Sequence, residues 1–175
     1  MTKKFILIFA SILLLSTGIY AQKFAYVDTD YILNNIPEFN QAQDKLDEIS
    51  KEWQVEIEAI YAEVDKMYRD YQTQEVLLTD EMKKKREDVI ISKEKSAKDL
   101  QKKRFGPEGD LYAKRQELIK PLQDKVYDAI QQLAANSKYA VIFDSSSDLI
   151  MLYANPNLDK SDKILENLGY LGKGK

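Results

Sequence analysis

The sequence predicts an α+β protein in which a small β body carries a long, protruding, antiparallel α-helical coiled-coil hairpin. Apolar residues follow a coiled-coil spacing in a stretch of residues 38–105 that contains neither glycine nor proline. Short runs rich in aromatic and β-branched residues stand on either side of that stretch. They predict strands near residues 23–28, 139–144 and 149–153.

The first 21 residues have the layout of a cleavable secretory signal peptide. Lys3 and Lys4 precede an apolar run, which ends in small residues, and we expect cleavage after Ala21. The run is shorter than the roughly 20 apolar residues that a membrane span needs, although an uncleaved anchor is the alternative. Because no cysteine follows the run, lipid attachment at that position is excluded. We expect the body to comprise residues 22–37 and 105–175, which include the root of the arm, and the arm residues 38–104.

The composition excludes several classes of function. The 175 residues include no cysteine and no histidine, which removes disulfides, thiol and imidazole catalysis and the usual zinc ligands. The glycines form no nucleotide-binding motif, so we expect neither an enzyme nor a cofactor. Without Lys3 and Lys4 the chain keeps 24 basic against 29 acidic side chains. This net negative charge argues against nucleic acid as a partner.

The first predicted strand leads into a short helix. Asp28 and Thr29 provide N-cap chemistry directly after the strand, and Tyr31, Ile32 and Leu33 follow.

Pro37 opens the long outgoing helix, which we expect to extend to about Leu77. Its apolar residues recur at spacings of three and four, with one stutter between Ile49 and Ile57. A helix of about 40 residues would reach about 60 Å, which exceeds the diameter of a domain of this size. The helix must therefore protrude. The residues of this seam are Phe39, Ala42, Leu46, Ile49, Trp53, Ile57, Ile60, Val64, Met67 and Tyr71.

A second helix is predicted over Glu81 to Arg104, after a tight turn near residues 76–78. It contains fewer apolar residues but a complementary charge. Residues 38–81 hold thirteen acidic and four basic side chains, whereas residues 83–104 hold ten basic and four acidic ones. Each exposed ion pair contributes only a few tenths of a kcal/mol, so charge selects the partner helix and the seam supplies the stability.

Glycine and proline at residues 105–109 predict a break or bend, after which the helix resumes through Leu133 with a further kink at Pro121. Residues 139–144 and 149–153 flank a serine-rich turn and predict a β-hairpin. Ser161 and Asp162 can cap a last short helix, and Gly169 can end it. Three nearly continuously apolar strands make a body that is marginal alone, so the chain is expected to self-associate.

The order of these parts resembles the Skp, or OmpH-like, family of periplasmic chaperones. The resemblance covers the strand Phe24-Ala25-Tyr26-Val27-Asp28, the charged hairpin and the C-terminal Tyr139-Ala140-Val141-Ile142-Phe143-Asp144. It implies a periplasmic homotrimer in which strands of three copies form a small barrel-like body. Three arms would then hang around a cavity that holds unfolded outer-membrane proteins without ATP.

Three sets of residues are candidates for function. Apolar side chains beside the seam could contact a client, or could merely widen the hairpin interface. Basic side chains could meet an anionic client, anionic lipid or lipopolysaccharide, or could form a solvated face paired with the acidic arm. The break after the second helix could be a hinge or a static kink. The client-contact set is Val55, Tyr61, Tyr68, Val76, Leu77 and Val89; the basic set is Lys83, Lys84, Lys85, Arg86, Lys102, Lys103 and Arg104; the hinge set is Gly106, Pro107 and Gly109.

A different class of function remains open. The hairpin could belong to a periplasmic structural or adaptor protein and dock one folded partner. Export adaptors usually place such hairpins between glycine-rich β domains, and this sequence contains none.

Overall fold

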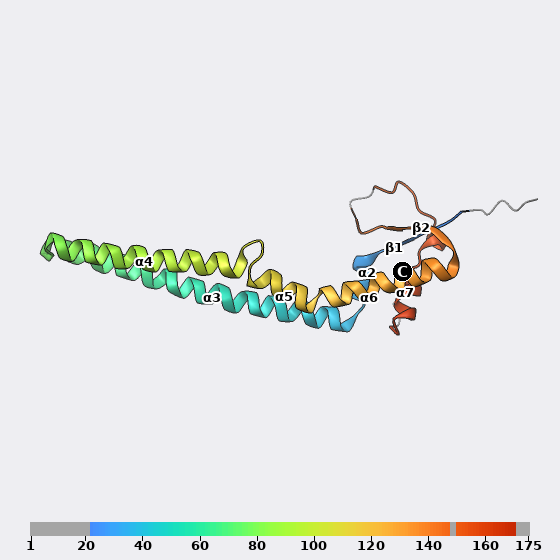
Figure 1. Cartoon of the computed structure of the whole chain (residues 1–175), viewed down its shortest axis with the longest axis horizontal. Helices are drawn as coiled ribbons and strands as arrows, with labels where there is room; N and C mark the ends of the chain where they lie inside the picture. Colours follow the sequence, from blue (N-terminus) through green and yellow to red (C-terminus); the bar gives the residue numbers. More distant parts are fainter. Residues whose placement is uncertain (1–21, 148–149, 171–175) are drawn as a thin grey trace, which may run out of the picture.

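A computed structural model describes residues 22–147 and 150–170, so the predicted signal peptide lies outside the described residues. The molecule is a long rod with a small mixed α/β body at one end (Figure 1). Helices α3 (Pro37–Gln74) and α4 (Asp80–Phe105) lie side by side and antiparallel along the rod. The short 3-10 turn η1 (Glu75–Leu77) joins them at the far end. The predicted helical hairpin is therefore confirmed.

The apolar seam of α3 faces its neighbours as predicted. All ten seam residues are buried or half-buried, including Phe39, Leu46, Ile57, Val64 and Tyr71. At 1.5 Å per residue, the 38 residues of α3 extend for about 57 Å. The helix can extend this far because its apolar residues repeat at coiled-coil spacing and so keep one face packed along the arm.

The seam of α4 is much thinner. Ile90 and Ala97 are its buried residues, and Lys83 and Arg104 occupy the same face one heptad before and after them. Between the two helices, in the described part of the chain, only two ion pairs form. Lys93 Nζ lies 2.8 Å from Glu63 Oε2, and Arg104 Nη2 lies 3.3 Å from Glu56 Oε2. The large charge difference between the helices thus gives few ion pairs. Apolar packing of α4 on α3 therefore supplies most of the stability of the hairpin.

The chain returns to the body through two further helices. α5 (Asp110–Leu118) follows the predicted break and packs against α3, and α6 (Lys120–Ser137) continues into the body. The break between them falls at Ile119, directly before the first turn of α6 that contains Pro121. This agrees with the predicted kink, because proline is accepted in a first helical turn but not in a helix interior.

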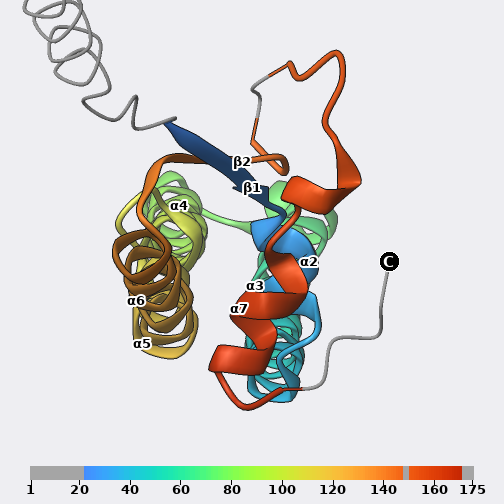
Figure 2. The ribbon, with the colours of Figure 1, turned by 90° about the vertical axis from the view of Figure 1, so that its right-hand side faces the viewer.

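A two-stranded parallel sheet forms one side of the body. β1 (Lys23–Val27) pairs with β2 (Tyr139–Asp144), and Val27 lies opposite Asp144. Figure 2 shows this sheet above a group of helices that includes α2 (Thr29–Asn34), α6 and α7 (Ser161–Asn167). The main core lies between the sheet and the helices. Its buried residues are Val27, Ile32, Leu33, Ile36, Phe39, Leu46, Ile119, Val126, Ala129, Leu133, Ile164 and Leu165.

The predicted β-hairpin of residues 139–144 and 149–153 is wrong. β2 pairs with the N-terminal strand β1, and the described residues 150–153 form no strand. The Asp144 side chain instead fixes the end of β2 to the start of α2, because it accepts hydrogen bonds from the Ser146 backbone and from both the backbone and hydroxyl groups of Thr29. The described residues 150–155 then lead to the 3-10 turn η2 (Pro156–Leu158).

Side-chain hydrogen bonds also join β1, α2 and α7 at the same junction. Asp28 caps α2 as predicted, accepting from the Tyr31 backbone N–H at 2.8 Å. Ser161 opens α7 but does not cap it. Its hydroxyl donates to Asp159 and accepts from the Asp28 N–H, which links α7 to β1. Gly169 ends this region with a φ of +87°, a conformation that glycine adopts without steric penalty.

Candidate functional site

The arm exposes most of the predicted client-contact residues. Tyr61 is the exception: it is half-buried and its hydroxyl donates to Gln101 of α4 at 3.4 Å, so it widens the interface between the helices. The other members of the set point into solvent. They are Val55, Tyr68, Val76, Leu77 and Val89.

The far end of the arm presents two neighbouring apolar side chains. Val76 is 90% exposed and Leu77 is 84% exposed, both in the turn η1. The next residue, Leu78, packs instead against the small core of Val64, Tyr71 and Ile90. The turn thus separates an inward leucine from two outward apolar residues, and exposed neighbouring apolar side chains of this kind are candidates for contact with a partner.

A small core holds the end of the hairpin together. Val64 and Tyr71 of α3 and Ile90 of α4 are buried, and the Tyr71 hydroxyl donates a hydrogen bond to Glu87. This bond raises the pKa of Tyr71 to about 12, because the carboxylate stabilises the protonated phenol. This core therefore joins α3 to α4 near the tip, while Val76 and Leu77 remain exposed.

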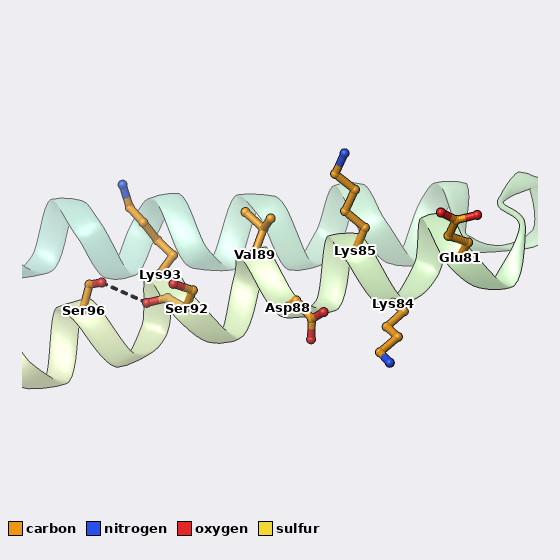
Figure 3. A pocket seen from close by; sticks show the side chains of 8 residues that line it. All are labelled: Glu81, Lys84, Lys85, Asp88, Val89, Ser92, Lys93 and Ser96. Atoms are coloured by element: carbon orange, nitrogen blue, oxygen red, sulfur yellow. Dashed lines mark hydrogen bonds between the residues drawn. The ribbon is translucent and has the colours of Figure 1, made fainter.

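The predicted basic residues divide into two groups. Lys84, Lys85 and Arg86 are exposed, and Lys83 is half-buried. No side chain in residues 22–147 or 150–170 forms an ion pair with any of the four. Figure 3 shows Lys85, Val89 and Lys93 projecting from one side of α4, while Lys84 and Asp88 project from the opposite side. An apolar residue thus stands between two cations along the same face of the helix.

Near the root of the arm, the basic residues differ in role. Lys102 and Lys103 are exposed and form no ion pair in the described part of the chain. Arg104 instead lies 2.7 Å from Asp110 and 3.3 Å from Glu56. Its guanidinium also lies 4.5 Å from the ring centre of Trp53. These contacts assign Arg104 a structural position between three helices, whereas Lys102 and Lys103 are exposed to solvent.

The loop between α4 and α5 is held by close backbone contacts. A Cβ atom on Gly106 would lie 2.4 Å from the Lys102 carbonyl oxygen, and one on Gly109 would lie 2.6 Å from that of Lys103. The side chain of Arg104 spans the loop to Asp110. These glycines allow the backbone to turn tightly beside α4, while α3 continues unbroken opposite the loop. Alanine at either position would distort the turn, so such variants cannot isolate a hinge motion.

A groove near the end of the arm was not predicted. It lies between α3 and α4 and has a volume of about 480 Å³. We call it the tip groove; its lining residues are Met67, Asp70, Met82, Lys85, Arg86, Val89 and Ile90. Lys85 and Val89 also line a second hollow, shown in Figure 3, whose lining residues all belong to α4, so the two side chains are shared by both hollows.

One signal in the sequence could have indicated this groove. Val89, Ile90 and Ile91 are consecutive, and successive helical residues are rotated by about 100°, so they cannot all face one seam. Ile90 is buried, whereas Val89 and Ile91 are exposed. Met82, a further apolar residue of this helix, is 49% exposed and lines the groove.

In the ranges 22–147 and 150–170, no helix is long and apolar enough to cross a membrane. Those same ranges contain no cluster of acidic side chains arranged to hold a metal ion.

Comparisons with known proteins agree on one family. A family profile described as outer membrane protein (OmpH-like) matches residues 23–168. The chaperone protein Skp of Vibrio cholerae is 27% identical over 168 residues, which cover 92% of each chain. The crystal structure of an OmpH-like protein from Caulobacter crescentus CB15 aligns with a TM-score of 0.66 at 15% identity over 86% of each chain, a similarity of fold. The chain therefore belongs to the OmpH-like family of outer membrane proteins, which includes chaperones named Skp.

Proposed function

We propose that this protein is an ATP-independent holdase chaperone that binds unfolded outer-membrane proteins and prevents their aggregation. The observation that supports it most is the exposure of apolar side chains along a rigid arm, above all Val76 and Leu77 at its end. The relative from Vibrio cholerae is itself named a chaperone. The proposal involves no catalytic step.

The spacing of the exposed residues suits weak and repeated contacts. Val55, Tyr68 and Val89 are separated along the arm by charged side chains. An unfolded β-barrel chain offers many apolar side chains, so several weak contacts act together through their high effective concentration. Each contact alone is easily released, which allows transfer of the client without ATP.

We further propose that three copies complete the body and that their arms enclose a cavity. The outer face of the sheet supports this, because Phe24, Val141 and Phe143 are exposed there in one chain. Ile150 and Leu152 in the following loop are also exposed, Leu152 by 97%. Burial of this apolar surface against neighbouring copies would stabilise the body. A solution mass of three chains supports the cavity, and the mass of a single chain contradicts it.

The proposed site of action is the periplasm, which the protein reaches by export across the inner membrane with cleavage of the signal peptide, residues 1–21. Mass spectrometry of protein purified from the producing cells should find a chain that begins at Gln22. Lys84 and Lys102, which lack ion pairs in the described part of the chain, could also contact anionic lipid or lipopolysaccharide. Binding to such surfaces should fall steeply as salt is raised, because exposed charges are screened.

The holdase proposal is tested with a urea-denatured outer-membrane β-barrel protein, diluted into buffer without ATP. The mature chain should suppress light scattering at a small molar excess. The double variant Val76→Ser/Leu77→Ser should suppress it less well. Tyr112→Ser is the control, because it removes an exposed apolar side chain outside the tip. Failure of the wild-type chain to reduce scattering would contradict the proposal. Tight binding of one folded protein in its place would favour an adaptor.

A further inference from the structure

The tip groove combines an apolar floor with a rim of both charges. Met67 and Met82 contribute flexible thioether side chains that adapt to differently shaped apolar groups. Ile90 is buried beneath them, and Val89 is 50% exposed at the edge. The floor therefore lies between two helices that the core around Tyr71 holds in place.

The charges on the rim come from different helices. Lys85 and Arg86 belong to α4, and Asp70 belongs to α3. In the described part of the chain, none of these three side chains forms an ion pair within 4.0 Å. The rim thus offers two cationic donors on one side and one carboxylate acceptor on the other.

We propose that the tip groove binds an extended peptide segment that carries two apolar side chains two residues apart and an acidic side chain beside them. Met82 and Ile90 are eight residues apart on α4, so the groove extends for about 12 Å. In an extended chain, side chains two residues apart point the same way and are about 7 Å apart. Two such side chains fit the length of the groove.

The charges favour a peptide over a lipid as the occupant. A carboxylate of the segment can accept hydrogen bonds from Lys85 and Arg86, and Asp70 can accept from the backbone N–H groups of the segment. A lipid phosphate would use the two cations but would be repelled by Asp70. The acyl chains of a lipid also offer no donor to that carboxylate. The inference rests on the proposed function, for which it names the class of client segment.

The test uses the mature full-length chain and short fluorescein-labelled peptides. One peptide carries a phenylalanine and a leucine two residues apart followed by an aspartate; its partner carries asparagine in place of the aspartate. Fluorescence anisotropy at low salt should show that Lys85→Gln/Arg86→Gln weakens binding of the aspartate peptide about fivefold or more, since each exposed charge contributes modestly. Lys102→Gln/Lys103→Gln removes the same charge from the same helix and should change binding less than about twofold.

A second variant tests the floor. Met82→Ser should weaken binding of both peptides, because it removes an apolar side chain from the floor at a half-exposed position and leaves the buried core intact. The groove assignment is overturned if the two double variants weaken binding equally, or if both peptides bind equally well to the wild-type chain. It is also overturned if phosphatidylglycerol vesicles, and not the peptides, depend on Lys85 and Arg86.

The aggregation assay on the same samples separates the two proposals. If the wild-type chain suppresses aggregation but the groove substitutions do not change peptide affinity, the groove assignment fails and the holdase proposal stands. If the groove substitutions weaken peptide binding as expected but the wild-type chain does not suppress aggregation, the holdase proposal fails and the groove assignment stands.

Discussion

Replacement of Arg104 by methionine should loosen the root of the arm. Arg104 is the last basic residue of α4, and its side chain is 23% exposed. It contacts Asp110 of α5 at 2.7 Å and Glu56 of α3 at 3.3 Å, and its guanidinium stacks on Trp53 at 4.5 Å. Trp53 also meets Phe105 edge-on, with ring centres 6.4 Å apart. One side chain therefore joins α4 to both of its neighbouring helices.

The size of the effect follows from these contacts. A hydrogen bond to a charged group contributes about 1.5 kcal/mol or more, but the carboxylates of Asp110 and Glu56 are 33% and 46% exposed. We therefore assign about 1 kcal/mol to each ion pair and about 1 kcal/mol to the stacking on Trp53. Against this, Arg104 Nε is buried and finds no partner in the described part of the chain, an offset of about 1 kcal/mol. The net loss is about 2 kcal/mol, which corresponds to about 30-fold more frequent local opening.

Hydrogen exchange measured by mass spectrometry can test this number. Amides at the end of α4 should exchange about 30-fold faster in Arg104→Met, while amides of α6 in the body keep their rates. Arg104→Lys retains the charge but loses the planar fork and most of the stacking, so it should recover only part of the protection. Equal exchange at the end of α4 in the wild-type chain and in Arg104→Met would refute the assignment of Arg104 as the link between the helices.

Three further perturbations test other parts of the molecule. Ile90→Ala should destabilise the arm by about 2 kcal/mol, at the lower end for a buried aliphatic residue because the core is thin, and faster hydrogen exchange in residues 80–95 measures this. The pKa of Tyr71 is raised to about 12, so its stabilising effect is present below pH 10, its ordinary pKa, and is lost between about pH 10 and pH 12. The melting temperature of the wild-type chain, measured by the helical circular dichroism signal at a series of pH values, should therefore fall above pH 10. Tyr71→Phe should lack that pH-dependent loss. Lys138→Gly should raise the melting temperature through a gain of about 1 kcal/mol, because Lys138 adopts the left-handed conformation at the end of α6 with φ of 57°; an unchanged or lower value would contradict the strain.

The arm could be predicted because its seam is local and periodic. The spacing from Phe39 to Tyr71 determines which face of α3 is buried, whatever packs against it. Thr79 marks the start of α4 in the same way, since its side chain accepts from the Met82 backbone N–H. Such signals need no knowledge of distant residues.

The pairing of the strands could not be predicted in this way. The run 149–153 has strand composition and follows β2 after a turn, which are the usual signs of a hairpin. The structure pairs β2 with β1, a strand more than 100 residues earlier. The hydrogen bonds from Thr29 to Asp144 that fix this arrangement join residues 115 apart in the sequence. Only the fold brings them together, so no local pattern reports them.

The tip groove could not be predicted for a related reason, because the seam pattern distinguishes only residues that face the partner helix from residues that do not. Val89 and Ile90 are adjacent, yet one faces solvent and the other the core. Met67 is half-buried at the boundary and belongs to both surfaces. The buried Ile90 and the exposed Val89 are about 100° apart around the axis of α4. Because of this separation, substitutions at Val89 or Lys85 can test the proposed binding while Ile90 continues to hold the hairpin together.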